Sequence, residues 1–169
     1  MADLPLFHYH HQQWFPLPIQ QVFSFFECPE NLALVTPPSL DFKQLTPAPV
    51  LMRAGTLIDY TIRRFGLRLR WRTLITVYQQ PLLFVDEQLT GPYSYWRHEH
   101  HFESEKGGTR MRDRVTYALP NYLPDFVARP IERYVVRPQL QKIFSYREER
   151  FASLLSDDQT EGRLVLGRI

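Results

Sequence analysis

Apolar and polar residues alternate with a period of two through much of segment 56–119. This spacing is typical of strands with one buried face, because successive side chains of a strand point to opposite sides of the sheet. We predict strands at 56–64 and 67–78, joined by a two-residue turn at Phe65-Gly66. The expected cross-strand partners are Tyr60 and Trp71, Ile58 and Thr73, and Asp59 and Arg72. The pairing leaves one face of this hairpin apolar and aromatic and the other face charged.

A second hairpin is predicted from strands at 95–103 and 109–119, with its turn at either Lys106-Gly107 or Gly107-Gly108. Both turns give the same parity, so the residues predicted to point inward do not depend on the choice. These are Trp96, His98, His100, Phe102, Met111, Asp113, Val115 and Tyr117. The other face carries arginines and glutamates that can pair across the strands, and we expect a salt-bridged outer surface.

The strand at 82–89, between the two hairpins, is less determined. A three-residue connection at 91–93 would turn Phe84, Asp86 and Gln88 inward, whereas a two-residue connection would select Val85, Glu87 and Leu89. We prefer the former.

Helical spacing flanks this strand-rich region. A first strand at 7–15 is followed by two short helices, the first beginning at Ile19 and the second covering 30–35, and then by a weak strand at 40–46. A broken apolar stripe from about 126 to 155 predicts a long C-terminal helix, which Pro138 must kink or restart near Arg137. We therefore expect one α+β domain over 1–155 and a C-terminal tail at 156–169.

Several classes of protein are excluded. The chain has 169 residues, which suits one domain, and no apolar run approaches the ~20 residues of a bilayer-spanning helix. Cys28 is the single cysteine, so neither an intrachain disulfide nor a cysteine zinc cluster can form. The net charge of +2 does not indicate a nucleic-acid partner. No secretory signal is visible, and we expect a cytoplasmic protein.

Polar residues on the face predicted to be buried are the most informative feature. This face carries Tyr60, Trp71, Trp96, His98, His100, Asp113 and Tyr117 among its apolar residues. A buried polar group without a partner costs about 1–3 kcal/mol, so these groups either pair with one another or line a cavity. A curved sheet around a single helix leaves room for such a cavity, because one helix is too narrow to fill the concave side.

The order of elements resembles the START-like helix-grip superfamily, SRPBCC, which includes birch-pollen-allergen-like and polyketide cyclase/aromatase-like proteins. The segments IQQVFSFFECPENLALVTPP, GTLIDYTI, FVDEQLTGPYSYWRHEHHFE and GGTRMRDRVTYALP are similar to bacterial members labelled cyclase/dehydrase or lipid-transport-like. The resemblance implies a seven-stranded curved antiparallel sheet wrapped around a long C-terminal helix. It further implies a hydrophobic small molecule, of the lipid, polyketide, quinone or isoprenoid class, bound in a cavity without a cofactor.

The expected ligand is amphipathic, with a hydroxyl or carboxylate held by the polar residues of the cavity wall. The predicted ligand-binding residues are Tyr60, Trp71, Thr73, Asp86, Gln88, Trp96, His98, His100, Met111, Asp113, Tyr117, Ile143 and Phe144. His98, His100 and Asp113 are also the candidate catalytic residues, since a carboxylate that orients an imidazole makes a general base. The same three could bind a metal, but hydrogen-bonded histidines are the preferred interpretation, and no metal is predicted. We assign no role to His8, His10 and His11.

Two other functions stay open at this point. One is a cyclase/aromatase-like enzyme that uses the His–Asp pair, although no catalytic signature of the superfamily can be matched residue by residue. The other is a protein-interaction module, for example a homodimer, in which segment 163–169 pairs with a sheet edge or docks in a groove.

Overall fold

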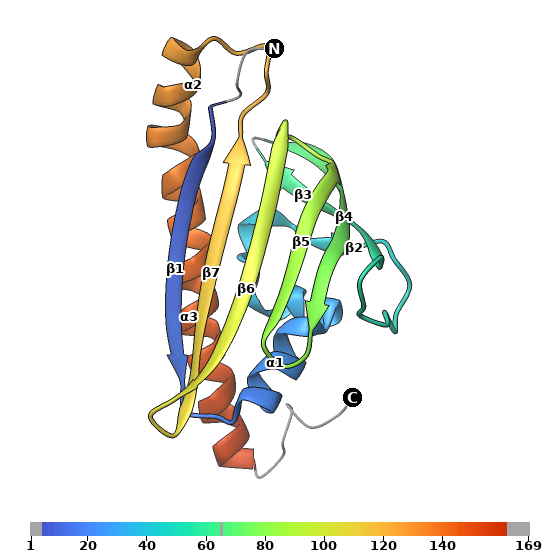
Figure 1. Ribbon diagram of the computed structural model, residues 1–169, viewed down its shortest axis with the longest axis vertical. Helices are drawn as coiled ribbons and strands as arrows, with labels where there is room; N and C mark the ends of the chain where they lie inside the picture. Colours follow the sequence, from blue (N-terminus) through green and yellow to red (C-terminus); the bar gives the residue numbers. More distant parts are fainter. Residues whose placement is uncertain (1–4, 65, 162–169) are drawn as a thin grey trace.

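Seven strands form one antiparallel sheet in the order β1-β7-β6-β5-β4-β3-β2, with the helices on one of its faces (Figure 1). The structure is a computed structural model that describes residues 5–64 and 66–161. The strands are β1 (Phe7–Phe15), β2 (Lys43–Gln44), β3 (Leu57–Arg64), β4 (Leu67–Gln79), β5 (Leu83–Thr90), β6 (Tyr95–Glu105) and β7 (Gly108–Ala118). This architecture confirms the predicted α+β helix-grip fold.

The registers of both hairpins follow from their short turns. In β3–β4, Tyr60 faces Trp71 and Ile58 faces Thr73, as predicted. In β6–β7, Glu105 pairs with Gly108, so the turn is Lys106-Gly107. Both turn residues have positive φ, 52° and 76°, which suits the right-handed twist of a two-residue hairpin.

The β5 strand has the parity that a three-residue connection at 91–93 would give. Asp86 pairs with His98, and Phe84 pairs with His100. Directly paired residues point to the same side of a sheet, so Phe84 and Asp86 share the inner face with both histidines.

Gly108 lies where the end of β1 approaches the start of β7. A Cβ at Gly108 would lie 2.2 Å from the backbone oxygen of Phe15, whereas a Cβ at Gly107 would have no atom within 4 Å. We expect Gly108→Ala to lower the free energy of unfolding by about 2–3 kcal/mol, since this backbone oxygen cannot move without disturbing the β1–β7 ladder. The matched variant Gly107→Ala should cost only about 1 kcal/mol, from its positive φ. Urea denaturation measures both, and equal losses would contradict this account of Gly108.

Short helices cross the end of β1 and lead to the other edge of the sheet. They are α1 (Ile19–Glu27), the 3₁₀ helix η1 (Pro29–Val35) and the 3₁₀ helix η2 (Pro38–Leu40). The strand predicted at 40–46 is wrong in extent, because only Lys43–Gln44 pairs with β3. The prolines before it favour the 3₁₀ turn, and Asp41 follows in a left-handed conformation with φ of 40°, so extended structure starts late.

The C-terminal region has the interruption that Pro138 predicts. It consists of α2 (Asp125–Ile131), the π-helical turn η3 (Glu132–Val136) and the long helix α3 (Arg137–Glu161). A proline lacks the N–H of a regular helix and its ring crowds the preceding turn, and a π-helical turn accommodates both effects. The helix continues beyond residue 155 into the segment predicted as a tail, which contains no proline or glycine up to Glu161. Residues 162–169, the rest of that segment, lie outside the described residues.

Helix α3 runs behind β1 and β7 and covers the concave side of that half of the sheet (Figure 1). One apolar cluster, rich in phenylalanine, joins β1, α1 and α3 and includes Phe15, Phe23 and Phe151. A second cluster joins β1 and β7 to the start of α3 and includes Tyr9, Val115 and Leu140. No helix in the described ranges has both the length and the apolar character needed to cross a bilayer.

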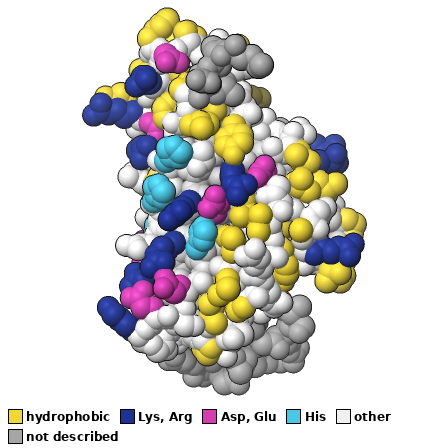
Figure 2. Space-filling model, viewed as in Figure 1, with side chains coloured by type: hydrophobic (Ala, Val, Ile, Leu, Met, Phe, Trp, Pro, Cys, Tyr) yellow, Lys and Arg dark blue, Asp and Glu magenta, His cyan; other side chains and the backbone are white. Residues whose placement is uncertain are grey.

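The outer face of the sheet is charged and internally paired. Basic and acidic side chains lie side by side over the surface where β1, β7 and β6 run (Figure 2). Arg72 donates two hydrogen bonds of 2.9 Å to the carboxylate of Asp59, and Arg112 pairs with Glu103 at 2.6 Å. This pairing is the salt-bridged outer surface that the alternation predicts.

Candidate functional site

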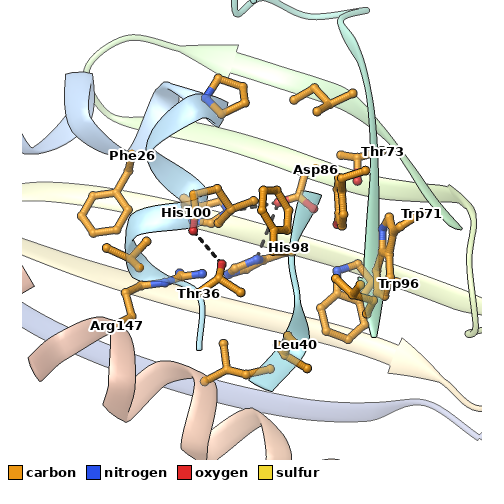
Figure 3. A pocket seen from close by; sticks show the side chains of 18 of the residues that line it. Phe26, Thr36, Leu40, Trp71, Thr73, Asp86, Trp96, His98, His100 and Arg147 are labelled. Atoms are coloured by element: carbon orange, nitrogen blue, oxygen red, sulfur yellow. Dashed lines mark hydrogen bonds and ion pairs between the residues drawn. The ribbon is translucent and has the colours of Figure 1, made fainter. Parts of the chain in front are cut away.

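A cavity of about 210 Å³ lies between the inner face of the sheet and α3 (Figure 3). Its walls come from α1, η1, η2, strands β3 to β6, and the first part of α3. Apolar and aromatic side chains dominate the lining, among them Phe26, Leu40, Ile58, Phe84, Trp96, Leu140, Ile143 and Phe144. Concave, mostly apolar sites with a few polar groups are the common form of small-molecule sites.

Most of the residues predicted for the site line this cavity. They are Tyr60, Trp71, Thr73, Asp86, Trp96, His98, His100, Ile143 and Phe144. The structure brings these together from strands β3, β4, β5 and β6 and from α3, which are far apart in sequence. Strand parity placed Tyr60, Trp71, Asp86 and His98 on the side of the sheet that faces the cavity, but it did not decide which inward residues reach the cavity.

Four predicted residues lie elsewhere: Gln88, Met111, Asp113 and Tyr117 are not among the cavity-lining residues. Gln88 donates from its side-chain amide to the backbone oxygen of Tyr93 at 2.7 Å. Met111 and Tyr117 are completely buried in the two apolar clusters, and the Tyr117 hydroxyl donates to Glu132 at 2.9 Å. The physical reason is that α3 lies directly against β7, so inward residues of β7 contact the core rather than the cavity.

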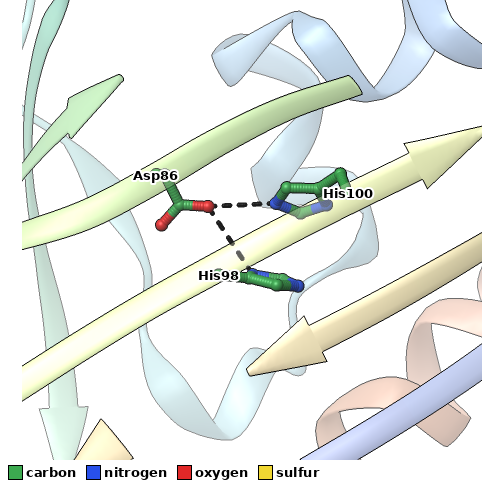
Figure 4. A group of neighbouring side chains, drawn as sticks. All are labelled: Asp86, His98 and His100. Atoms are coloured by element: carbon green, nitrogen blue, oxygen red, sulfur yellow. Dashed lines mark hydrogen bonds and ion pairs between the residues drawn. The ribbon is translucent and has the colours of Figure 1, made fainter. Parts of the chain in front are cut away.

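Asp86, His98 and His100 form a polar part of the cavity wall (Figure 4), and the carboxylate of Asp113 lies against both histidines. His98 Nε2 donates to Asp113 Oδ1 at 2.9 Å, and His100 Nε2 donates to Asp86 Oδ2 at 3.0 Å. His100 Nδ1 also lies 3.0 Å from Asp113 Oδ1. The sheet register builds this cluster, since Asp86 pairs with His98 across β5–β6 and His100 pairs with Asp113 across β6–β7.

The pKa values of Asp113, His98 and His100 are shifted in different directions. Burial opposes the charge of Asp113, but hydrogen bonds from His100 and His98 outweigh burial and hold the pKa of this carboxyl well below its usual value. Burial lowers the pKa of His98, and the neighbouring charge of His100 lowers it further. Burial also opposes the charge of His100, but Asp113 and Asp86 outweigh it and raise the pKa of that imidazole. Burial and the charge of His100 therefore disfavour protonation of His98, whereas the two carboxylates favour protonation of His100.

Arg147 of α3 is a cavity residue that sequence reasoning missed. Its Nη1 lies 3.9 Å from Asp113 Oδ1, and its guanidinium lies over the ring of Phe144, 5.0 Å from the centroid. The side chain is buried, and its Nε has no hydrogen-bond partner among the described residues. The signal was present in the sequence, because Arg147 follows Phe144 by three residues and so shares its helical face.

The indole nitrogen of Trp71 is a second buried donor at the cavity wall. Trp71 is 5% exposed, and its Nε1 has no hydrogen-bond partner within the described part of the chain. Its ring stacks on Tyr60 and meets the edge of Trp96, with ring centroids 5.9 and 5.3 Å apart, so the N–H is held in place. The cavity wall therefore carries a buried donor without an acceptor among the described residues on the sheet, Trp71 Nε1, and another on α3, Arg147 Nε.

The chain matches a known protein family over most of its length. Residues 15–144 match the family described as polyketide cyclase / dehydrase and lipid transport. The chain belongs to this family. Its fold is the helix-grip fold of the SRPBCC superfamily, which the quoted segments had indicated.

Several solved structures have a fold similar to that of this chain over most of its length. Protein Ms6760 from Mycobacterium smegmatis superposes with a TM-score of 0.65 at 19% identity, over 89% of this chain and 91% of that one. The Zhui aromatase/cyclase from Streptomyces sp. R1128 gives 0.65 at 13% identity, over 89% and 96%. Ara h 8.0201 gives 0.59 at 16% identity, over 88% and 99%.

These likenesses show the fold alone, because all three identities are low. Among curated proteins, no relative matches the chain. Family and fold together suggest either hydrophobic ligand binding or a polyketide cyclase/aromatase-like function.

Proposed function

We propose that this family member binds a compact amphipathic small molecule in the cavity between the sheet and α3. The observation that carries the proposal is the combination of an apolar wall with two buried donors, Trp71 Nε1 and Arg147 Nε, that have no partner in the described chain. A buried donor without an acceptor costs about 1–3 kcal/mol, and a ligand acceptor would recover this energy.

The size and charge of the cavity narrow the class of ligand. Its volume of about 210 Å³ lies below the roughly 300–1,000 Å³ of sites for drug-sized ligands, which favours a body of one or two rings or a short chain. Arg147 favours an anionic acceptor such as a carboxylate, because guanidinium pairs well with planar anions. We therefore favour small carboxylic acids with an aromatic or isoprenoid body over long-chain lipids.

A cyclase/aromatase-like enzyme is the alternative function. The family name and the likeness to the Zhui aromatase/cyclase support it, and His98 beside Asp113 supplies an oriented imidazole. Incubation with a bound ketone-bearing ligand separates the two functions, since a binding protein releases the ligand unchanged and a cyclase releases a product of altered mass or absorbance.

Filling the cavity tests the binding proposal. Leu140 is buried in the cavity wall on α3, and Leu140→Trp adds an indole where the ligand body would lie. With 2-naphthoic acid as the probe, isothermal titration calorimetry should show one site in the natural protein and at least tenfold weaker binding in Leu140→Trp. Tenfold corresponds to about 1.4 kcal/mol, well within the cost of displacing a bound ring.

The control for this experiment is Leu67→Trp, which makes the same substitution at a leucine that is 66% exposed. This variant should bind the probe as the natural protein does. The uncharged methyl ester of the probe should bind more weakly than the acid. Equal binding by both tryptophan variants, or no measurable binding of the acid to the natural protein, would refute the proposal.

A further inference from the structure

Three potential metal-ligand atoms meet at one point of the cavity wall: Asp86 Oδ2, His98 Nδ1 and His100 Nε2 (Figure 4). The carboxylate oxygen lies 3.6 Å from His98 Nδ1 and 3.0 Å from His100 Nε2. Bonds of about 2.1 Å that meet at angles of about 90–120° place neighbouring ligand atoms about 3.0–3.6 Å apart. Asp86 Oδ2 is therefore already at the separation from each imidazole nitrogen that a bound metal ion would impose, and the ligand atoms of all three residues lie within 4.8 Å of one another.

Asp113 lies on the opposite side of both imidazoles. Its Oδ1 is 2.9 Å from His98 Nε2 and 3.0 Å from His100 Nδ1, so it faces the nitrogen of each ring that the candidate site does not use. Histidine ligands of metals usually direct their second nitrogen to a carboxylate, which fixes the tautomer and the orientation of the ring. Here one buried carboxylate is hydrogen-bonded to the second nitrogen of His98 and lies 3.0 Å from the second nitrogen of His100.

The contact between His98 and Asp86 also fits a shared metal ion. His98 Nδ1 lies 3.6 Å from Asp86 Oδ2, and no hydrogen bond joins the two groups within the described residues. This separation is too long for a good hydrogen bond but is within the spacing expected for two ligands of one metal ion.

We propose that Asp86, His98 and His100 bind a divalent first-row transition metal, with Zn²⁺ as the reference ion. Two imidazoles and one carboxylate suit such ions, whereas Mg²⁺ and Ca²⁺ prefer oxygen ligands throughout. Metal binding replaces the proton between His100 Nε2 and Asp86, and that proton leaves to solvent. The remaining coordination positions face the cavity, where water or an oxygen of the ligand completes the shell.

The proposal goes beyond the function proposed above and revises the interpretation of the histidines that the sequence favoured. Spacing alone gave a weak signal, because two histidines two residues apart on a strand occur for many reasons. The new observations are the third ligand, Asp86, from a strand whose parity was open, and the single carboxylate behind both rings.

The test uses the protein after EDTA treatment and dialysis, titrated with ZnCl₂ by calorimetry in the absence of any organic ligand. We expect one equivalent of Zn²⁺ to bind, and Co²⁺ to give the intense visible absorption of a four- or five-coordinate site with nitrogen ligands. Asp86→Asn should weaken Zn²⁺ binding at least tenfold. Its matched control is Glu87→Gln, the next residue of β5, whose carboxylate pairs with Arg97 on the outer face and should not affect the metal.

Two results would overturn the proposal. One is the absence of Zn²⁺ binding by the natural protein, and the other is equal affinity in Asp86→Asn, which would show that the ion does not bind at Asp86. Asp113→Asn, if it folds, should weaken binding by about 10–100-fold without changing the stoichiometry, the usual effect of losing a carboxylate behind a ligand. Naphthoic acid binding is measured with EDTA present, so the metal site and the ligand cavity can fail independently.

Discussion

Replacement of Asp113 by alanine is expected to lower the free energy of unfolding by about 3–5 kcal/mol, the usual cost of removing one partner from a buried ionic cluster. Asp113 is 2% exposed, and its carboxylate lies next to His98, His100 and Arg147 on the core side of the cavity wall. Its low pKa keeps it ionised at neutral pH, so the substitution removes a full negative charge. The guanidinium of Arg147 would then be buried without this counter-ion, and His98 and His100 would lose the carboxylate oxygen that lies 2.9 and 3.0 Å from their rings. Urea denaturation at pH 7, with EDTA present, measures the loss.

The control for this prediction is Asp59→Ala on the outer face. Asp59 accepts two hydrogen bonds from Arg72, but the side chains of Asp59 and Arg72 are 20% and 43% exposed, so the loss should be much smaller than at Asp113. Asp113→Asn should fall between the two, because it keeps an acceptor oxygen and loses the charge. If Asp113→Ala were no more harmful than Asp59→Ala, the buried cluster would contribute nothing to stability and its role would be functional alone.

The sequence was sufficient to predict the register of β3–β4, whereas for β6–β7 it left two turns open that give the same parity. Two-residue turns leave no freedom of register, and strand parity then decides which side chains share a face, as at Tyr60 and Trp71. The charged outer face followed from the same rule. The family resemblance added that seven strands form one curved sheet around the C-terminal helix, which local patterns alone do not specify, and the pairing of β1 with β7 came only from the structure.

Strand parity could not predict which inward residues line the cavity and which are buried in the apolar core. Parity places Met111 and His100 on one side of the sheet, but it does not say that α3 covers β7 and leaves β3 to β6 open to a cavity. That difference depends on where the long helix lies across the sheet, which is set by packing between distant segments. Gln88 shows a further limit, because its amide is engaged by the backbone of a neighbouring loop.

Helical residues of the site were also difficult to assign. The apolar stripe of α3 gave Ile143 and Phe144, but an arginine one turn later is more often placed on the solvent side by sequence reasoning. In the structure Arg147 is buried because Asp113 supplies a counter-ion and Phe144 and Phe26 supply ring faces. Asp113 on a strand and Arg147 on the helix that covers it are buried together because each partly neutralises the charge of the other. Neither residue alone indicates from the sequence that it is buried.

Phe151→Ala is expected to have an effect as large as Asp113→Ala, through packing rather than charge. Phe151 of α3 is 1% exposed, and its ring contacts Phe15 at 4.6 Å, Phe25 at 4.9 Å and Phe26 at 5.6 Å between centroids. The substitution should cost about 3–5 kcal/mol, since it removes the buried ring and leaves a cavity among rigid neighbours. Urea denaturation measures this loss.

The matched control is Phe126→Ala in α2, which removes a ring that is 78% exposed and should change stability by less than about 0.5 kcal/mol. Because Phe25 and Phe26 also line the cavity, Phe151→Ala should additionally weaken naphthoic acid binding, whereas Phe126→Ala should not. A variant at Phe151 that loses stability but binds the probe normally would show that the aromatic cluster only anchors α3. Loss of both properties would show that this cluster also holds the α1 end of the cavity in the shape that the ligand requires.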